Sequence, residues 1–226
     1  MQCSPFRMLV IVLAIFSIGF HLTGIIAPAW LRMSMEIHTD LKDSSVEVHI
    51  GLWFNIICQN GGMAKDCVTM FTFGNMDSDG ETPAMNFEVI KALVMTGESM
   101  CLLGFVLVLI HFHRENNLNP SQALAVLAAL VFFVCALIVF GAVGIQGYRN
   151  QTFVDTTTSL YTSSNGQISF EIYFPWALLV SGIGAALALF AAMAVSIHVC
   201  CYKPQHRGDV VYSANYTSSP QTEPMY

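Results

Sequence analysis

Long apolar runs alternate with polar segments along this chain. Four runs predict membrane-spanning helices at 8–29, 90–111, 123–145 and 174–199. Each run is near or above the roughly 20 residues that a helix needs to cross the hydrocarbon core of a bilayer. A buried helix of a soluble protein would usually be shorter and would have a polar face. The pattern therefore predicts a mainly α integral membrane protein, built as a bundle of four transmembrane helices.

The polar segments complete the predicted organisation. They are an N-terminal segment 1–7, a long loop 30–89, a short loop 112–122, a second loop 146–173 and a tail 200–226. We expect the tail to be disordered. Basic residues slightly favour one orientation, since Arg7, Arg114, Lys203 and Arg207 lie on the side of the termini, against Arg32, Lys91 and Arg149. By the positive-inside rule the termini and the short loop are cytosolic, and the other two loops are extracellular.

The first apolar run has an alternative interpretation as a cleaved secretory signal. Arg7 precedes the run, and Ala27-Pro28-Ala29 resembles a cleavage site. The run is longer than the roughly 7–15 residues of a typical signal core, which favours a retained helix. Cleavage would leave the sides of the remaining loops unchanged.

The long loop has the pattern of a small β-sheet. Apolar and polar residues alternate over 45–52, which predicts a half-buried strand running into the segment 51–53. A second strand is predicted at 67–73, and residues 59–62 supply turn residues between the two. We therefore expect a small extracellular antiparallel sheet that contains a hairpin.

Two of the seven cysteines, Cys58 and Cys67, share the long loop. The others lie in apolar runs (Cys101, Cys135) or at the predicted cytosolic ends of helices (Cys3, Cys200, Cys201). Cys58 and Cys67 are the natural disulfide pair if the loop is in an oxidising compartment. The alternative is two unpaired thiols in a cytosolic loop. We expect no metal site, because no other Cys and no clear His partner completes a set of four ligands.

An N-glycosylation sequon lies in the second loop at Asn150-Gln151-Thr152. It can be used only if that loop is extracellular, which agrees with the side assigned from the cysteines. A second sequon begins at Asn215, in the predicted cytosolic tail, where we expect it to be inert.

One set of residues resembles a known family. Trp30, the Gly51-Leu52-Trp53 triplet, Cys58 and Cys67 resemble the W…GLW…C…C signature of the claudin superfamily. That superfamily includes claudins, peripheral myelin and epithelial membrane proteins, and gamma-type auxiliary subunits of channels and receptors. Lys91 resembles the basic residue that closes the family's first extracellular segment. The resemblance covers about residues 5–202.

The end of the fourth helix adds to the resemblance, and other features depart from it. Cys200 and Cys201 resemble palmitoylation sites of claudins, with buried structural thiols as the alternative. Four residues separate Trp53 from the first cysteine, where claudins usually have two. The acidic segment 74–81 looks like an added, solvated loop. The chain ends at Tyr226 without the Tyr-Val that claudins often present to PDZ scaffolds, so capture by such a scaffold is not expected.

Charge is concentrated in the long loop, which carries nine acids and three bases between Arg32 and Val89. If loops of neighbouring molecules lined a passage between cells, this excess would attract cations and repel anions. The resemblance implies that carboxylates near the cysteine pair face such pores, which makes Asp66 the candidate pore acid. The alternative is an acidic surface that only keeps the loop soluble.

Glu98 is an ionisable residue within the second apolar run. Such a group usually faces the interior of a bundle and has a partner, which we expect to be His21 or Thr23 unless the carboxyl is protonated. A structural role is favoured over ion conduction. Small residues at 141–144 and 182–186 suit close packing of helices.

Several functional classes are not supported. We find no pairing of a nucleophile with a base and no phosphate-binding or dinucleotide motif, so we expect neither an enzyme nor a cofactor. A net charge of −6 without a basic patch argues against nucleic-acid binding. The resemblance implies a junction protein of the plasma membrane that binds itself and related claudin-like proteins, as a barrier or a cation-favouring pore. The alternatives are an auxiliary subunit of a channel or receptor, and an adhesion protein of the myelin or epithelial-membrane type.

Overall fold

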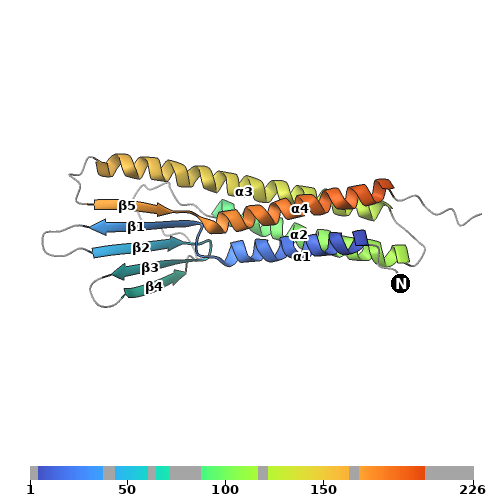
Figure 1. Ribbon diagram of the computed structural model, residues 1–226, viewed down its shortest axis with the longest axis horizontal. Helices are drawn as coiled ribbons and strands as arrows, with labels where there is room; N and C mark the ends of the chain where they lie inside the picture. Colours follow the sequence, from blue (N-terminus) through green and yellow to red (C-terminus); the bar gives the residue numbers. More distant parts are fainter. Residues whose placement is uncertain are drawn as a thin grey trace, which may run out of the picture.

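A computed structural model describes residues 5–37, 44–60, 65–71, 88–116, 122–162 and 168–201. The helices are α1 (Pro5–Ile26), α2 (Glu88–Asn116), α3 (Gln122–Thr162) and α4 (Trp176–Cys201). The strands are β1 (Leu31–Ile37), β2 (Ser44–Ile50), β3 (Phe54–Asn60), β4 (Lys65–Phe71) and β5 (Ile168–Tyr173). Figure 1 shows an elongated molecule. The sheet lies at one end of the bundle, and α1 starts at the opposite end.

Each of the four helices is long and apolar enough to cross a membrane. Large apolar side chains such as Phe16, Leu137 and Phe190 are exposed on the outside of the bundle. In contrast, the bundle core contains many small residues, which let helix backbones approach closely. Among them are the buried alanines Ala14, Ala125, Ala128, Ala136, Ala185, Ala188 and Ala191. Large apolar side chains on the outside and small residues in the core form a pattern that suits a multi-pass membrane protein.

The helices do not pack equally against one another. α1 lies along α4, α4 along α3, and α3 along α2, whereas α1 and α2 contact each other less extensively. Val10 and Ser17 of α1 are fully buried in the bundle. Of the small residues expected to allow close packing, Gly184 packs against His21. Gly141, Gly144 and Gly182 have no described atom within 4 Å of a Cβ placed there, so they do not serve this purpose within the described bundle.

The five strands form one antiparallel sheet in the order β4-β3-β2-β1-β5. Cys58 in β3 lies directly opposite Cys67 in β4, and the two form a disulfide, as the cysteine positions predicted. The predicted strand near 46–52 is confirmed but ends at Ile50. The segment 51–53 does not continue it and instead forms the turn into β3, in which the Gly51 amide donates to the Phe54 carbonyl at 3.1 Å.

The strand register assigns each side chain to one of two faces, because neighbouring residues of a strand point in opposite directions. Glu47 shares a face with Arg32, His49 and Lys65, and we call this the charged face. We call the other face the apolar face. It includes Met33, Met35, Val46, Val48, Ile57, Val68 and Met70. The sheet therefore has two chemically distinct sides.

α3 is much longer than the predicted helix 123–145. It continues to Thr162, so most of the expected loop 146–173 is helix, and its last residues form β5. At 1.5 Å per residue a helix of 41 residues is about 61 Å long, roughly twice the thickness of the hydrocarbon core. Figure 1 shows the extension running past the bundle beside β5. The acidic segment 74–81, the sequon at Asn215 and the C-terminus at Tyr226 lie outside the described residues.

Candidate interaction surface

Trp30 joins the sheet to the bundle. Its side chain is fully buried, and its indole Nε1 donates to the carbonyl of Gly24 at 2.8 Å. Its backbone amide donates to the carbonyl of Ile50 at 2.9 Å, so one residue is bonded to both α1 and β2. The surrounding cluster draws on α1, α2, α3 and α4, through members that include Ile25, Ile90, Val94, Ala142 and Leu178. Trp30 is therefore the structural link between the two parts of the molecule.

The other family-motif residues lie at the same junction. Leu52 is buried in the Trp30 cluster, and the ammonium of Lys91 lies 5.6 Å from the ring centroid of Trp53, a cation–π contact. A Cβ at Gly51 would lie 2.7 Å from the carbonyl oxygen of Phe54 and 2.9 Å from the Cα of Pro28. Both are backbone atoms that cannot move aside, so this turn requires glycine. The motif residues thus attach the sheet to the bundle and do not form an exposed site.

Asn150, the predicted glycosylation site, is buried on the extension of α3 and is 8% exposed. Its amide nitrogen donates to the carbonyl of Trp30 at 2.8 Å, and its amide oxygen accepts from Gln146 at 2.8 Å. Glycosylation needs that same nitrogen to be accessible, so the prediction is incompatible with this fold. Asn150 instead supplies the hydrogen bond that the buried Trp30 carbonyl requires.

Strand β4 is the exposed edge of the sheet. Every one of its residues is solvent-accessible, and its apolar side chains are among them: Val68 is 55%, Met70 47% and Phe71 67% exposed. Figure 1 shows β4 on the opposite side of the sheet from α3 and β5. The unpaired backbone groups of an exposed, apolar edge strand are a template for pairing with another chain, which soluble proteins normally avoid. The sequence predicted a strand here but did not reveal that it forms the edge.

Asp66, the candidate pore acid, is exposed on this edge strand. Its register partner is Gln59, and the pleat places it on the apolar face with Val68 and Met70, away from the charged face. In the described part of the chain we find no ion pair that involves Asp66. The disulfide at the neighbouring Cys67 fixes the strand, so the carboxylate is held at the rim of the molecule.

Glu47 differs from Asp66, because two cationic side chains and a histidine surround its carboxylate. Its carboxylate accepts from the Nε of Arg32 at 2.9 Å, from the Nζ of Lys65 at 2.7 Å and lies 3.0 Å from Nε2 of His49. Hydrogen bonds from Lys65 and Arg32 lower the pKa of Glu47 from its ordinary value of 4.5 to about 2. Its negative charge is therefore compensated locally and adds little to the cation attraction that we expected of the long loop.

Glu98 and the juxtamembrane cysteines lie where the sequence suggested. The Oε2 of Glu98 is 3.4 Å from Nδ1 of His21, whereas Thr23 donates to Gly19 of its own helix, so His21 is the neighbour. Cys200 and Cys201 are free and exposed at the end of α4. Their exposure argues against buried structural thiols and leaves palmitoylation as a prediction.

An apolar groove of about 430 Å³ lies where the bundle meets the sheet. It is lined by residues of α1, of the segment after α1, of β3 and of α4, namely Leu22, Thr23, Ile26, Ala27, Pro28, Phe54 and Trp176. Comparison of the chain with protein-family models and with curated proteins finds no match.

Proposed function

We propose that this chain is a claudin-like junction protein of the plasma membrane, and that its sheet binds the sheets of neighbouring copies. The observation that carries the proposal is the β4 edge, which is apolar, exposed and tied to β3 by a disulfide. The resemblance of the Trp30, 51–53, Cys58 and Cys67 residues to the claudin signature supplies the partner, a second copy of the same kind of chain.

The burial of the motif residues supports separate roles for the two sides of the sheet, one in attachment and one in binding. They hold the sheet on the bundle at one end, which leaves the far edge of the sheet free to meet another molecule. Edge-to-edge addition of strands gives affinity through backbone hydrogen bonds, and exposed side chains such as Val68 and Phe71 give specificity. In this arrangement the sheet is extracellular and both termini are cytosolic.

Asp66 gives the junction a preference for cations. Its carboxylate is exposed at the edge that meets the neighbour, and the charge of Glu47 is compensated on the other face. A passage bounded by two such edges carries an uncompensated negative charge, which attracts cations and repels anions most strongly at low salt.

The test is localisation and paracellular ion permeability in epithelial cells that lack their own claudins. We expect the wild type to concentrate at cell contacts and to pass sodium in preference to chloride. Asp66→Asn should weaken that preference without changing the localisation. Glu36→Gln is the matched control, because Glu36 is an exposed acid of the same sheet on the charged face. An equal effect of both variants would indicate a general surface charge and contradict a role specific to Asp66.

A second candidate function, an auxiliary subunit of a channel or receptor, is favoured by the apolar groove between α1, β3 and α4. A membrane helix of a partner could occupy this groove without engaging β4. The two functions predict different results in the same cells. Diffuse surface staining, together with co-purification of a channel or receptor that is lost in Phe54→Ser, would replace the junction proposal with this one.

A further inference from the structure

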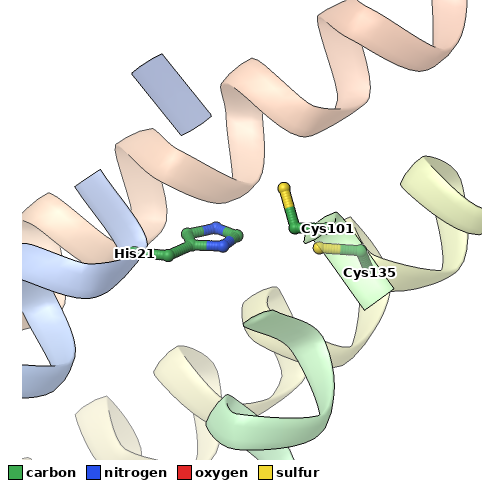
Figure 2. A group of neighbouring side chains, drawn as sticks. All are labelled: His21, Cys101 and Cys135. Atoms are coloured by element: carbon green, nitrogen blue, oxygen red, sulfur yellow. The ribbon is translucent and has the colours of Figure 1, made fainter. Parts of the chain in front are cut away.

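Three helices bring soft metal ligands together in the middle of the bundle. His21 of α1, Cys101 of α2 and Cys135 of α3 place one ligand atom each within 4.8 Å of one another. Figure 2 shows the imidazole of His21 directed toward the two cysteine side chains. The residues are 2%, 0% and 0% exposed, so the cluster is closed to solvent. This cluster could not be predicted from the sequence, because its members are far apart in the chain.

We propose that His21, Cys101 and Cys135 form a Zn²⁺ site. Zinc binds Cys sulfur at about 2.3 Å and His nitrogen at about 2.0–2.1 Å in a tetrahedral arrangement, so its ligand atoms lie about 3.5–3.8 Å apart. The three ligand atoms here lie within 4.8 Å of one another, so side-chain adjustments of about 1 Å gather them around a metal. This inference is independent of the proposed junction function.

The polar atoms of the cluster point to a ligand. Among the described residues, neither nitrogen of His21 and neither carboxyl oxygen of Glu98 has a hydrogen-bond partner, although both side chains are buried. Unpartnered buried polar groups cost free energy and are rare in folded proteins. A metal ion at His21 would remove part of that cost by using one of the two ring nitrogens.

Glu98 lies where a carboxylate orients a metal-bound histidine. Its Oε2 is 3.4 Å from Nδ1 of His21, a separation that a small adjustment converts into a hydrogen bond, which leaves Nε2 for the metal. A carboxyl group on the second nitrogen of a ligating histidine is a recurrent arrangement at zinc sites. Glu98 is therefore a positioning residue for His21.

The surrounding helices are shaped to hold these side chains. A Cβ at Gly184 would lie 2.2 Å from Cδ2 and 2.8 Å from Nε2 of His21, so only glycine leaves room for the ring beside α4. The hydroxyl of Ser17 donates to the Gly184 carbonyl at 2.8 Å and lies 3.4 Å from the sulfur of Cys101. Both Gly184 and Ser17 thus restrict where the ligands can lie.

The charge of the two cysteines suits a divalent ion. Binding releases one proton from each thiol, and the charge of the two thiolates then equals that of Zn²⁺. The ion would also tie α1 to α2 and α3, across the interface where α1 and α2 pack least extensively.

A second cluster, at the end of the bundle away from the sheet, provides a control. His111, Glu115 and His198 also lie within coordinating range of one another, but Glu115 is already paired with Arg7 at 2.8 Å. His198→Gln alters this cluster and leaves the proposed site intact. The double variant Cys200→Ser/Cys201→Ser removes two cysteines that are exposed and outside both clusters.

The test is the zinc content of the full-length chain, purified without an affinity tag in detergent and measured by elemental mass spectrometry. We expect about one zinc per chain in the wild type, in His198→Gln and in the Cys200→Ser/Cys201→Ser variant. Cys101→Ser and Cys135→Ser should each bind zinc more than about tenfold more weakly, and Glu98→Leu about tenfold. Circular dichroism would check that each variant remains helical.

Cobalt provides a spectroscopic readout of thiolate coordination. Co²⁺ bound by the wild-type chain should give a thiolate-to-cobalt charge-transfer absorption, which Cys135→Ser diminishes. The absence of both zinc and this absorption in the wild type would overturn the proposal. So would zinc that survives both Cys→Ser variants but disappears in His198→Gln, binding of copper(I) without zinc, or a Cys101–Cys135 disulfide in the purified chain.

Discussion

The two edges of the sheet differ in how they are held. At one edge β5 and β1 are fixed to the bundle through Trp30, and Asn150 on the extended α3 bonds the Trp30 carbonyl. At the other edge β4 has exposed apolar side chains and is secured by its hairpin and the Cys58–Cys67 bridge. The anchored edge fixes the position of the sheet, and the free edge is available to a partner.

Exposed apolar side chains therefore have two meanings in this molecule. On the bundle, residues such as Phe16 and Leu137 are exposed on helices that are long and apolar enough to cross a membrane, where lipid would cover them. Val68 and Phe71 are exposed on β4, which lies in the sheet at one end of the molecule (Figure 1). The proposed junction function assigns their exposure to a protein partner.

Replacing Trp30 should damage the anchored edge most severely. Trp30→Ala removes a fully buried indole from the junction, which should lower the free energy of unfolding by about 3–5 kcal/mol. Trp30→Phe keeps most of the volume and loses the hydrogen bond to Gly24, so we expect a loss of about 1 kcal/mol. Denaturant titration in detergent measures both. Equal losses in the two variants would show that volume is not what Trp30 contributes.

Removing the disulfide should loosen the free edge alone. The bridge closes a segment with a sequence separation of 9, so Cys58→Ser/Cys67→Ser should lower sheet stability by about 2–3 kcal/mol. Proteolysis after Lys65 should become faster, while cleavage near β5 is unchanged. The Cys200→Ser/Cys201→Ser variant serves as the control for cysteine replacement. Faster cleavage at both edges would mean that the edges are not independent.

Asn150→Ala tests the hydrogen bond at the anchored edge. The substitution leaves the buried Trp30 carbonyl and the Gln146 amide without their partner, at a cost of about 1–3 kcal/mol in unfolding free energy. The same denaturant titration measures the loss. Because the wild-type nitrogen is engaged, glycosidase treatment should leave the mass of the protein expressed in animal cells unchanged. A mass decrease would contradict the burial of Asn150.

Acid should weaken the ion pairs that connect the two edges. Glu47 of β2 binds Arg32 of β1 and Lys65 of β4, and these bonds lower its pKa to about 2. A carboxyl with a lowered pKa stabilises the fold above its ordinary value of 4.5, and the stabilisation is lost as the pH falls from 4.5 toward 2. The thermal midpoint of the sheet should therefore fall over that range in the wild type. In Glu47→Gln the decrease should be smaller; an unchanged decrease would assign it to other carboxylates.

The sequence predicted the parts of the fold that local pattern controls. Four apolar runs of membrane length became four helices, and the cysteine positions predicted the bridge. β3 was missed because Ile56 and Ile57 are adjacent, so this inner strand lacks the alternation of a half-buried one. β1 and β5 do alternate, in Leu31–Ile37 and Ile168–Tyr173, and a search for alternation over the whole of both predicted extracellular loops would have found them.

The extension of α3 depends on contacts that no local pattern contains. The segment after Gln146 is rich in threonine, and threonine is a weak helix former. In the structure Thr152 and Thr156 donate to carbonyls four residues earlier, and Asn150 bonds to Trp30, which is distant in sequence. The sequon at Asn150 looked like a surface site because the sequence does not show the contact with Trp30 that buries this side chain. The His21, Cys101 and Cys135 cluster was likewise invisible until three helices came together.

The most direct test of the central claim is enrichment at contacts between cells that lack their own claudins, with the free edge altered. Val68→Ser/Phe71→Ser removes apolar surface from β4 and leaves the anchored edge intact. Tyr148→Ser is the matched control, because Tyr148 is 73% exposed on α3 and lies outside β4. We predict that the double variant reaches the cell surface but loses its enrichment at contacts, whereas Tyr148→Ser keeps it. Full enrichment of the double variant would contradict the assignment of β4 as the surface that binds a second copy.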